Sequence, residues 1–414
     1  MAAGGYPDRY LDMALGGVAK SPRFIAGDPL RGLACLAILF WHTAVASGQI
    51  VSARGISPGM KSELGLFGPP VVTLSISIWS FFVLSGYLIS GPFVRAIVRG
   101  DARRPRLGAY ALNRVLRIVP AFWALLTLTI LLVGTEGNSF RQMLEFYGFA
   151  HVYDQGPFTD RMVQAWTLDV EAVFYAAVPL LLLPLAGLLG GRATPWRRAG
   201  VILAGCTVVA AASMALGEVG PRSAAIVPGS MWAFAPGIAL ATIEPLVRPW
   251  LEGRDLGRWI ARAFAAFALA GFLVYTYAVD PFSARLQNLV AAIACGSFLA
   301  APLVLQWTGE PTWRAFDNRV LHWLGVRAYG IYLTHVIAIY ELRHLIEDLG
   351  TVPMALLVAF PLILLISTAG GALSFRFIEM PFLERRIPWR SAEPAPAAPE
   401  PEPMPVVAPV AVTP

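Results

Sequence analysis

Long runs of apolar residues recur along the chain, and they limit its possible folds more than any other feature. A membrane-spanning helix needs about 20 apolar residues. Ten stretches come close to that length: 28–48, 70–90, 110–133, 168–190, 199–216, 229–246, 263–279, 287–307, 321–340 and 354–376. Only 14% of the 414 residues are Asp, Glu, Lys or Arg, too few to cover soluble domains, where about 25% is usual. We predict an all-α membrane protein, a polytopic bundle of about ten transmembrane helices.

The basic residues test this topology. With the N-terminus placed inside, 25 of the 32 Arg and Lys residues fall in inner segments and 7 in outer segments. Cytoplasmic loops of membrane proteins carry such an excess. The bias predicts an even number of spans, both termini cytoplasmic, and a multi-pass protein of the inner (cytoplasmic) membrane. It also accounts for the net charge of +6 without a nucleic-acid partner.

Composition divides the chain into three parts. We expect 1–26 to be a cytoplasmic N-terminal segment without a cleaved signal peptide, and 27–390 to be the transmembrane domain. Residues 391–414 are mostly Pro, Ala, Glu and Val, which cannot form a core, so we expect a disordered cytoplasmic tail. The three cysteines each lie in an apolar run without metal-ligand spacing, so we expect no metal site and no disulfide.

The first span contains two polar residues that a plain membrane anchor would not need. Arg31 and His42 are 11 residues apart, about three helical turns plus 20°, so they share one face and lie about 16 Å apart along the axis. A guanidinium suits a phosphate, and a neutral imidazole suits a general base. The alternative is an Arg that snorkels and a His hydrogen-bonded between helices, and spacing alone leaves both open.

Three further spans carry polar candidates. Ser85 precedes Gly86, a pair that favours close helix packing over a nucleophile. Glu171 is one turn before a tyrosine and suited to face inward, whereas Asp169 fits a simple charge at a helix N-terminus. Tyr332 and His335 are three residues apart on one helix face and can meet.

Predicted depth sorts these residues into two groups. His42, Glu171 and His335 fall in the outer half of the bilayer. A second group falls at the inner edge: Arg31, Arg95, Arg114, Arg117, Arg376 and Glu379. A tunnel for an anionic cytoplasmic ligand would have this arrangement, although inner-edge arginines also occur for topology alone.

Six short motifs, in this order, resemble the acyltransferase-3 family of integral-membrane acyltransferases over about 25–390. They are Leu30-Arg31-Gly32 with His42, the run 81–86, Arg114 to Pro120, Trp166 to Glu171 with Phe174-Tyr175, Tyr329 to His335, and Phe377 to Pro381. The chain departs from the family pattern at Pro29, Thr167 and Ala328, where Gly, Ser and Ser are common. None of these departures removes Arg31, His42 or Glu171.

The resemblance implies an all-helical enzyme that O-acylates surface glycans, antibiotics or lipids. Acyl-CoA, most simply acetyl-CoA, would enter from the cytoplasm as a co-substrate, with no permanently bound cofactor. Its phosphates would meet Arg31, Arg114 and Arg117, and Ser85 counts with these donor-binding residues. We expect no C-terminal hydrolase-like domain, which some members carry, after residue 390.

The resemblance also implies the catalytic group. His42 would remove the proton from an acceptor hydroxyl or take the acyl group itself, and Tyr332 and His335 would orient the reactants. We further expect Glu171 to contact His42 and fix its tautomer. The rival class is a transporter or flippase of a glycan or lipid without acyl transfer, and a sugar-binding sensor would not need the arginines. The sequence names neither the acceptor nor the acyl group.

Overall fold

The structure is a computed structural model. It describes residues 24, 26–53, 63–101, 106–154, 157–189, 193–217, 222–278, 284–314 and 316–387. Every regular element within these ranges is a helix. The expected N-terminal segment (apart from 24 and 26) and the expected tail 391–414 lie outside them.

Ten long helices coincide with the ten predicted stretches. They are α2 (Gly27–Ala53), α5 (Ser77–Arg99), α6 (Leu107–Val133), α8 (Trp166–Leu189), α9 (Pro195–Leu216), α11 (Ala235–Leu251), α12 (Gly257–Ala278), α13 (Ala284–Thr308), α14 (Arg319–Glu341) and α16 (Val352–Ser374). By length and apolarity, nine spans within the described ranges could cross a membrane. The helix that does not qualify is α14, which carries Arg327 and His335 among its polar side chains.

Shorter elements connect or extend the long helices. They are η1 (Gly65–Phe67), α4 (Gly68–Thr73), η2 (Leu74–Ile76), α7 (Phe140–Tyr147), η3 (His151–Tyr153), η4 (Pro157–Ala165), α10 (Arg222–Ser230), η5 (Met231–Phe234), α15 (Arg343–Leu349), the π-helical turn η6 (Phe375–Glu379) and α17 (Met380–Leu383). The apolar segment 143–153, between two of the predicted stretches, contains the end of α7 and all of η3.

Local sequence signals fix several helix ends. Asn318 caps α14, because its side chain accepts hydrogen bonds from the backbone N–H groups of Val320 and Leu321. Ser139 and Gln142 form a capping box at α7. α5 ends where Gly100 adopts a left-handed φ of 75°.

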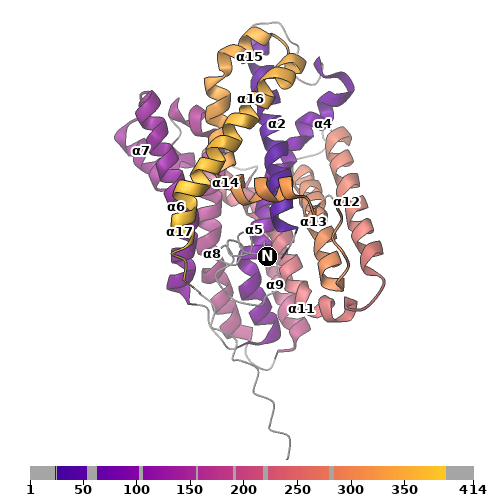
Figure 1. Cartoon of the computed structure of the whole chain (residues 1–414). Coiled ribbons are helices and arrows are strands. Elements are labelled where there is room, and N and C mark those ends of the chain that lie inside the picture. The colour runs from indigo at the N-terminus through magenta and orange to yellow at the C-terminus, as the bar shows by residue number, and fades with distance from the viewer. Residues whose placement is uncertain are drawn as a thin grey trace, which may run out of the picture.

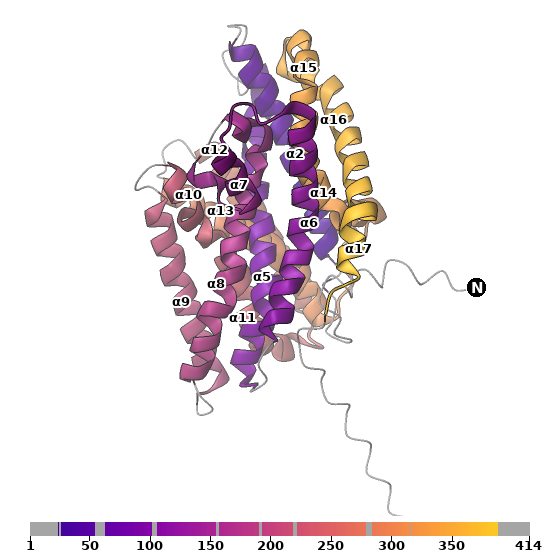
Figure 2. The ribbon, with the colours of Figure 1, turned by 90° about the vertical axis from the view of Figure 1, so that its left-hand side faces the viewer.

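The long helices run broadly along one direction (Figure 1). α5 lies near the centre and contacts α2, α8, α9, α11 and α13. α12 and α13 form a closely packed hairpin at one side. α6, α16 and α17 lie along another edge, where Figure 2 shows α17 beside α6.

Glycines allow α2 and α14 to approach closely. A Cβ on Gly32 would overlap the backbone oxygen of Leu321, and a Cβ on Gly325 would overlap that of Asp28. Small residues at such crossings let helix backbones meet in membranes. This contact sets α2 against α14 and so places His42 opposite His335.

The same device joins α5 to α11. A Cβ on Gly86 would overlap the backbone oxygen of Phe234, and one on Gly237 would overlap that of Val83. The predicted packing role of the Ser85-Gly86 pair is therefore confirmed for Gly86. Aromatic rings fill the neighbouring core, with Phe234 stacked on Phe174 at a centroid distance of 3.7 Å.

Candidate active site

Two histidines from different helices face each other in the interior. His42 on α2 and His335 on α14, here called the histidine pair, are 3.0 Å apart from Nδ1 to Nε2. The other ring nitrogen of His335, Nδ1, lies 2.5 Å from the backbone oxygen of Tyr332. His335 is fully buried. The structure thus brings together three of the predicted catalytic residues.

These contacts determine where the protons lie on two neutral rings. A backbone oxygen only accepts, so Nδ1 of His335 must carry the hydrogen and its Nε2 must accept. Nδ1 of His42 then carries the hydrogen that is donated to His335. The Nε2 of His42 is left with its lone pair, which is the arrangement that a general base or a nucleophile needs.

Tyr332 supports this region with its hydroxyl as well as its backbone. The hydroxyl lies 3.2 Å from Oγ1 of Thr167 and 3.3 Å from the backbone oxygen of Gln164. Gln164 in turn donates from Nε2 to the backbone oxygen of Leu333 at 2.8 Å. The start of α8 is therefore fastened to α14 beside the histidine pair.

Glu171 has different partners from the one that we expected. Ser85 donates to Oε1 at 2.9 Å, and Tyr175 donates to Oε2 at 3.0 Å. Both carboxylate oxygens are thus held by hydroxyl groups, while the Nδ1 of His42 faces His335. The expected role of fixing the His42 tautomer belongs to His335 in this geometry, and Glu171 instead joins α5 to α8.

The predicted anion-binding arginines lie on two helices, Arg31 on α2 and Arg114 and Arg117 on α6. Arg31 is ion-paired with Asp28, 2.8 Å from Nη1 to Oδ1. On α6, Arg117 is ion-paired with Glu379 at 3.0 Å. Arg114 lies over the rings of Tyr110 and Tyr175 at 5.9 and 5.8 Å, and its buried Nε has no hydrogen-bond partner among the described residues.

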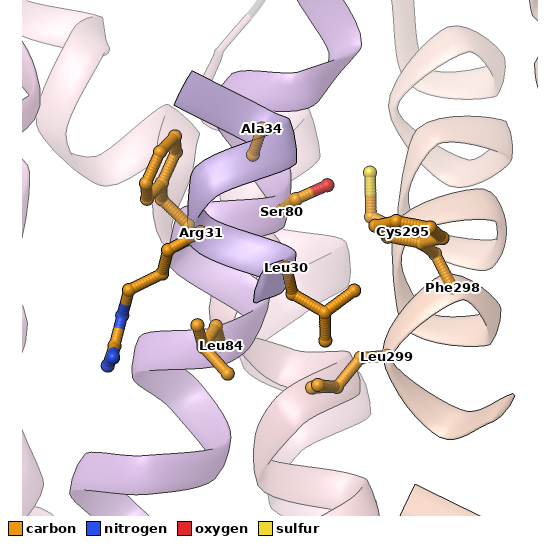
Figure 3. A pocket seen from close by; sticks show the side chains of 9 residues that line it. Leu30, Arg31, Ala34, Ser80, Leu84, Cys295, Phe298 and Leu299 are labelled. Atoms are coloured by element: carbon orange, nitrogen blue, oxygen red, sulfur yellow. The ribbon is translucent and has the colours of Figure 1, made fainter. Parts of the chain in front are cut away.

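One narrow pocket adjoins this region, between α2, α5 and α13 (Figure 3). Its lining is mostly apolar and includes Leu30, Leu84 and Leu299. Figure 3 shows the guanidinium of Arg31 pointing away from Cys295 and Phe298 on the far wall. The charged end of Arg31, which also lines the pocket, is therefore directed away from this far wall.

Arg31 and Arg117 nevertheless both interact with Glu171. Their guanidinium groups are close enough to interact electrostatically with its carboxylate. Tyr175, which donates to Glu171, also lies under the guanidinium of Arg114. Glu171 therefore connects the arginines to the helices that carry the histidine pair.

A buried pair next to the site escaped the sequence analysis. Asp169 is not an exposed charge at the helix end, because its carboxylate is buried and lies 3.0 Å from Nδ1 of His151. The same oxygen accepts the backbone N–H of Val152 at 3.2 Å, and His151 stacks on Phe146 at 4.3 Å. No sequence motif links these two residues, which are 18 positions apart in different helices.

The described part of the chain contains no cluster of three or more His, Cys, Asp or Glu side chains that could hold a metal ion. The three cysteines, all described, are unpaired; Cys35 and Cys295 are buried, and Cys206 is partly buried. A neutral imidazole such as that of His42 can transfer a proton or attack as a nucleophile.

Comparisons with known proteins show which family the chain resembles. The family model described as "Acyltransferase domain" matches residues 27–374. The chain is 26% identical to the "Putative peptidoglycan O-acetyltransferase YrhL" of Bacillus subtilis over 394 residues, covering 87% of this chain and 55% of that protein. It is 21% identical to the "Putative O-acetyltransferase SAR0937" of Staphylococcus aureus, covering 90% and 60%.

A third relative is closer in length. The chain is 24% identical to "Nodulation protein 10" of Rhizobium leguminosarum bv. viciae, covering 78% of this chain and 84% of that protein. By contrast, the chain spans less than two thirds of the first two relatives. No solved structure matches this chain.

Proposed function

The chain belongs to the acyltransferase-3 family of membrane acyltransferases, and we propose that it moves an acetyl group from acetyl-CoA to a hydroxyl of a surface or exported glycan, lipid or similar acceptor. The observation that carries the proposal is the lone pair on Nε2 of His42, which the contacts of His335 leave available. The names of the O-acetyltransferase relatives support an acetyl group and an oxygen acceptor.

The donor would enter from the cytoplasm, with the protein in the inner membrane and both termini inside. The excess of basic residues in the predicted inner segments supports this orientation. The phosphates of CoA would meet Arg31, Arg114 and Arg117. One guanidinium group can donate two parallel hydrogen bonds to the oxygens of a phosphate. The thioester would then extend toward His42, about 16 Å further along α2.

The transfer step follows from the protonation states. Nε2 of His42 takes the proton from the acceptor hydroxyl, and the oxygen attacks the thioester carbonyl. The tetrahedral intermediate collapses, the carbon–sulfur bond breaks, and the CoA thiolate takes the proton back from His42. The products are an acetyl ester and CoA. If the same lone pair attacks the thioester directly, the carbon–sulfur bond breaks, CoA leaves as the thiolate, and an acetyl-histidine forms. The acceptor hydroxyl then attacks the acetyl carbonyl, the carbon–nitrogen bond breaks, and the CoA thiolate takes the hydroxyl proton.

The surrounding residues hold this geometry. His335 accepts from Nδ1 of His42 and keeps the lone pair on Nε2, while the backbone of Tyr332 fixes the tautomer of His335. Glu171 holds Ser85 and Tyr175, so we assign it a positioning role between donor and histidine pair. The rival class, a transporter without acyl transfer, is set aside because the chain belongs to an acyltransferase family.

Turnover of a labelled donor tests the proposal. The purified chain in lipid nanodiscs is incubated with radiolabelled acetyl-CoA, with and without candidate acceptor glycans, and CoA release and label transfer are measured. We expect CoA release that requires His42. Absence of CoA binding and turnover in the wild-type chain, or equal turnover by His42→Ala, would refute it.

A further inference from the structure

Arg31, one of the residues proposed to bind the donor, shares a carboxylate with a histidine of the neighbouring helix. Oδ1 of Asp28 on α2 lies 2.8 Å from Nη1 of Arg31, and Oδ2 lies 3.6 Å from Nδ1 of His322 on α14. The Asp28 side chain is buried, whereas those of Arg31 and His322 are 30% and 33% exposed. We refer to Asp28, Arg31 and His322 as the Asp28 triad.

The close crossing of α2 and α14 fixes this arrangement. A Cβ on Gly325, one turn after His322, would overlap the backbone oxygen of Asp28. A Cβ on Gly32 would overlap the backbone oxygen of Leu321, the residue before His322. Because glycine lets the two backbones touch at both places, the helices hold His322 beside Asp28.

The charge of the Asp28 triad depends on the protonation of His322. With a neutral imidazole, the charges of Arg31 and Asp28 cancel. Arg31 also interacts electrostatically with the carboxylate of Glu171, which further weakens its attraction for a phosphate. With a protonated imidazole, the triad carries one net positive charge. Since histidine changes its charge between about pH 5 and 8, this difference falls in the physiological range.

Charged side chains from other segments lie near this end of α14. They are Arg314 and Asp317 before the helix, Arg319 and Arg327 on it, and Arg376 and Glu379 in η6. All but Arg327 and Glu379 are exposed. Arg327 lies over two aromatic rings, and Glu379 is ion-paired with Arg117. Among the described residues, Asp28 is therefore the carboxylate that pairs with His322.

We propose that His322 is a positioning residue for donor binding, which pairs with Asp28 when its ring is protonated and so releases Arg31 to bind a phosphate of CoA. This proposal rests on the proposed function and adds a linked proton to it. By reciprocity, bound CoA must favour the protonated form of His322 as much as the proton favours CoA.

Binding of CoA at two pH values, measured without turnover, tests the proposal. The full chain in phosphatidylcholine nanodiscs is titrated with CoA at about pH 5.5 and about pH 8. The wild type should bind CoA about fivefold more tightly than His322→Gln at the lower pH, as expected for two coupled sites, and within about twofold of it at the higher pH. Comparison at equal pH removes the titration of the CoA phosphate. His344→Gln is the matched control, because the His344 side chain is 73% exposed, and it should behave as the wild type.

Removal of the shared carboxylate tests the route through Asp28. In Asp28→Asn, Arg31 has no pairing carboxylate in the triad at any pH. This variant should bind CoA at about pH 8 at least as tightly as the wild type does, and adding His322→Gln should then change the Kd by less than about twofold at either pH. An effect of His322→Gln that persists in Asp28→Asn would overturn the positioning role.

The outcomes separate this proposal from the proposed function. If the wild type and His322→Gln bind CoA with the same pH dependence, the proposal fails and the proposed function stands. If the wild type binds no CoA at either pH, the proposed function fails and the proposal fails with it. An equal effect of His322→Gln on the Kd for pantetheine, which lacks the phosphates, would make the role of His322 structural and overturn the proposal.

Discussion

The histidine pair and the two arginines of α6, Arg114 and Arg117, treat polar groups in opposite ways. In the histidine pair, hydrogen bonds give the bonded ring nitrogens their donors and acceptors, and only Nε2 of His42 is left to act. On α6, Arg117 is ion-paired with Glu379 and interacts with Glu171, whereas Arg114 lies over two tyrosine rings and its buried Nε has no hydrogen-bond partner among the described residues. Since buried charge is costly when uncompensated, we propose that the first region carries the chemistry and the second binds the anionic end of the donor.

The largest effect should come from removing the lone pair. His42→Ala is expected to lower acetyl-CoA turnover by about 10³-fold, within the range for loss of a general base, while CoA affinity stays within about twofold. His344→Ala is the control, because His344 is exposed and its nearest carboxylate is Glu347 at 3.6 Å. Retention of a tenth or more of the activity by His42→Ala would place the chemistry elsewhere.

The next largest effect should come from His335, which holds the tautomer of His42 without being the base itself. His335→Ala removes the acceptor for Nδ1 of His42, so the imidazole is free to adopt the wrong tautomer. We expect kcat to fall by about 10- to 100-fold with the KM for acetyl-CoA unchanged. A raised KM with normal kcat would instead assign His335 to donor binding and remove the contrast between the two regions.

The arginines of α6 should show the reverse pattern. Arg114→Gln is expected to raise the KM for acetyl-CoA about tenfold and to leave kcat within about twofold, because it removes binding that is the same before and during the reaction. Arg141→Gln is the control, since the Arg141 side chain is 78% exposed. A loss of kcat at unchanged KM would contradict this division of roles.

The smallest expected effect concerns the helix contact beneath the histidine pair. Gly325→Ala forces a Cβ against the backbone of α2, and overpacking of this kind costs about 1–3 kcal/mol. We expect a Tm a few degrees lower and reduced kcat, because the two histidines move apart. Gly108→Ala on α6 is the control, since a Cβ there meets no atom within 4 Å. Equal behaviour of the two variants would show that the close approach does not set the histidine geometry.

The helices could be predicted from the sequence because apolarity over about 20 residues is a local property. The ten stretches therefore coincide with ten helices, of which α14 is too polar to qualify as a span. Helix direction and position also predicted a shared depth for His42 and His335. Their contact at 3.0 Å is a finding of the structure, because depth alone does not say which helices are neighbours.

Hydrogen-bond partners were not predictable in the same way. Depth placed Glu171 near His42, but rotation of α8 against α5 directs its carboxylate to Ser85 and Tyr175. The burial of Asp169 depends on a histidine in a short connecting helix. This is a tertiary contact that no local pattern encodes.

The most direct test asks whether the contacts of His335 leave the lone pair on Nε2 of His42. ¹⁵N NMR of the histidine-labelled chain in nanodiscs measures this tautomer. The chain has five histidines, so His42→Gln suffices to assign the signal. We predict that neutral His42 carries its hydrogen on Nδ1 and that His335→Ala abolishes this preference. A hydrogen on Nε2 of His42 in the wild-type chain at neutral pH would contradict it.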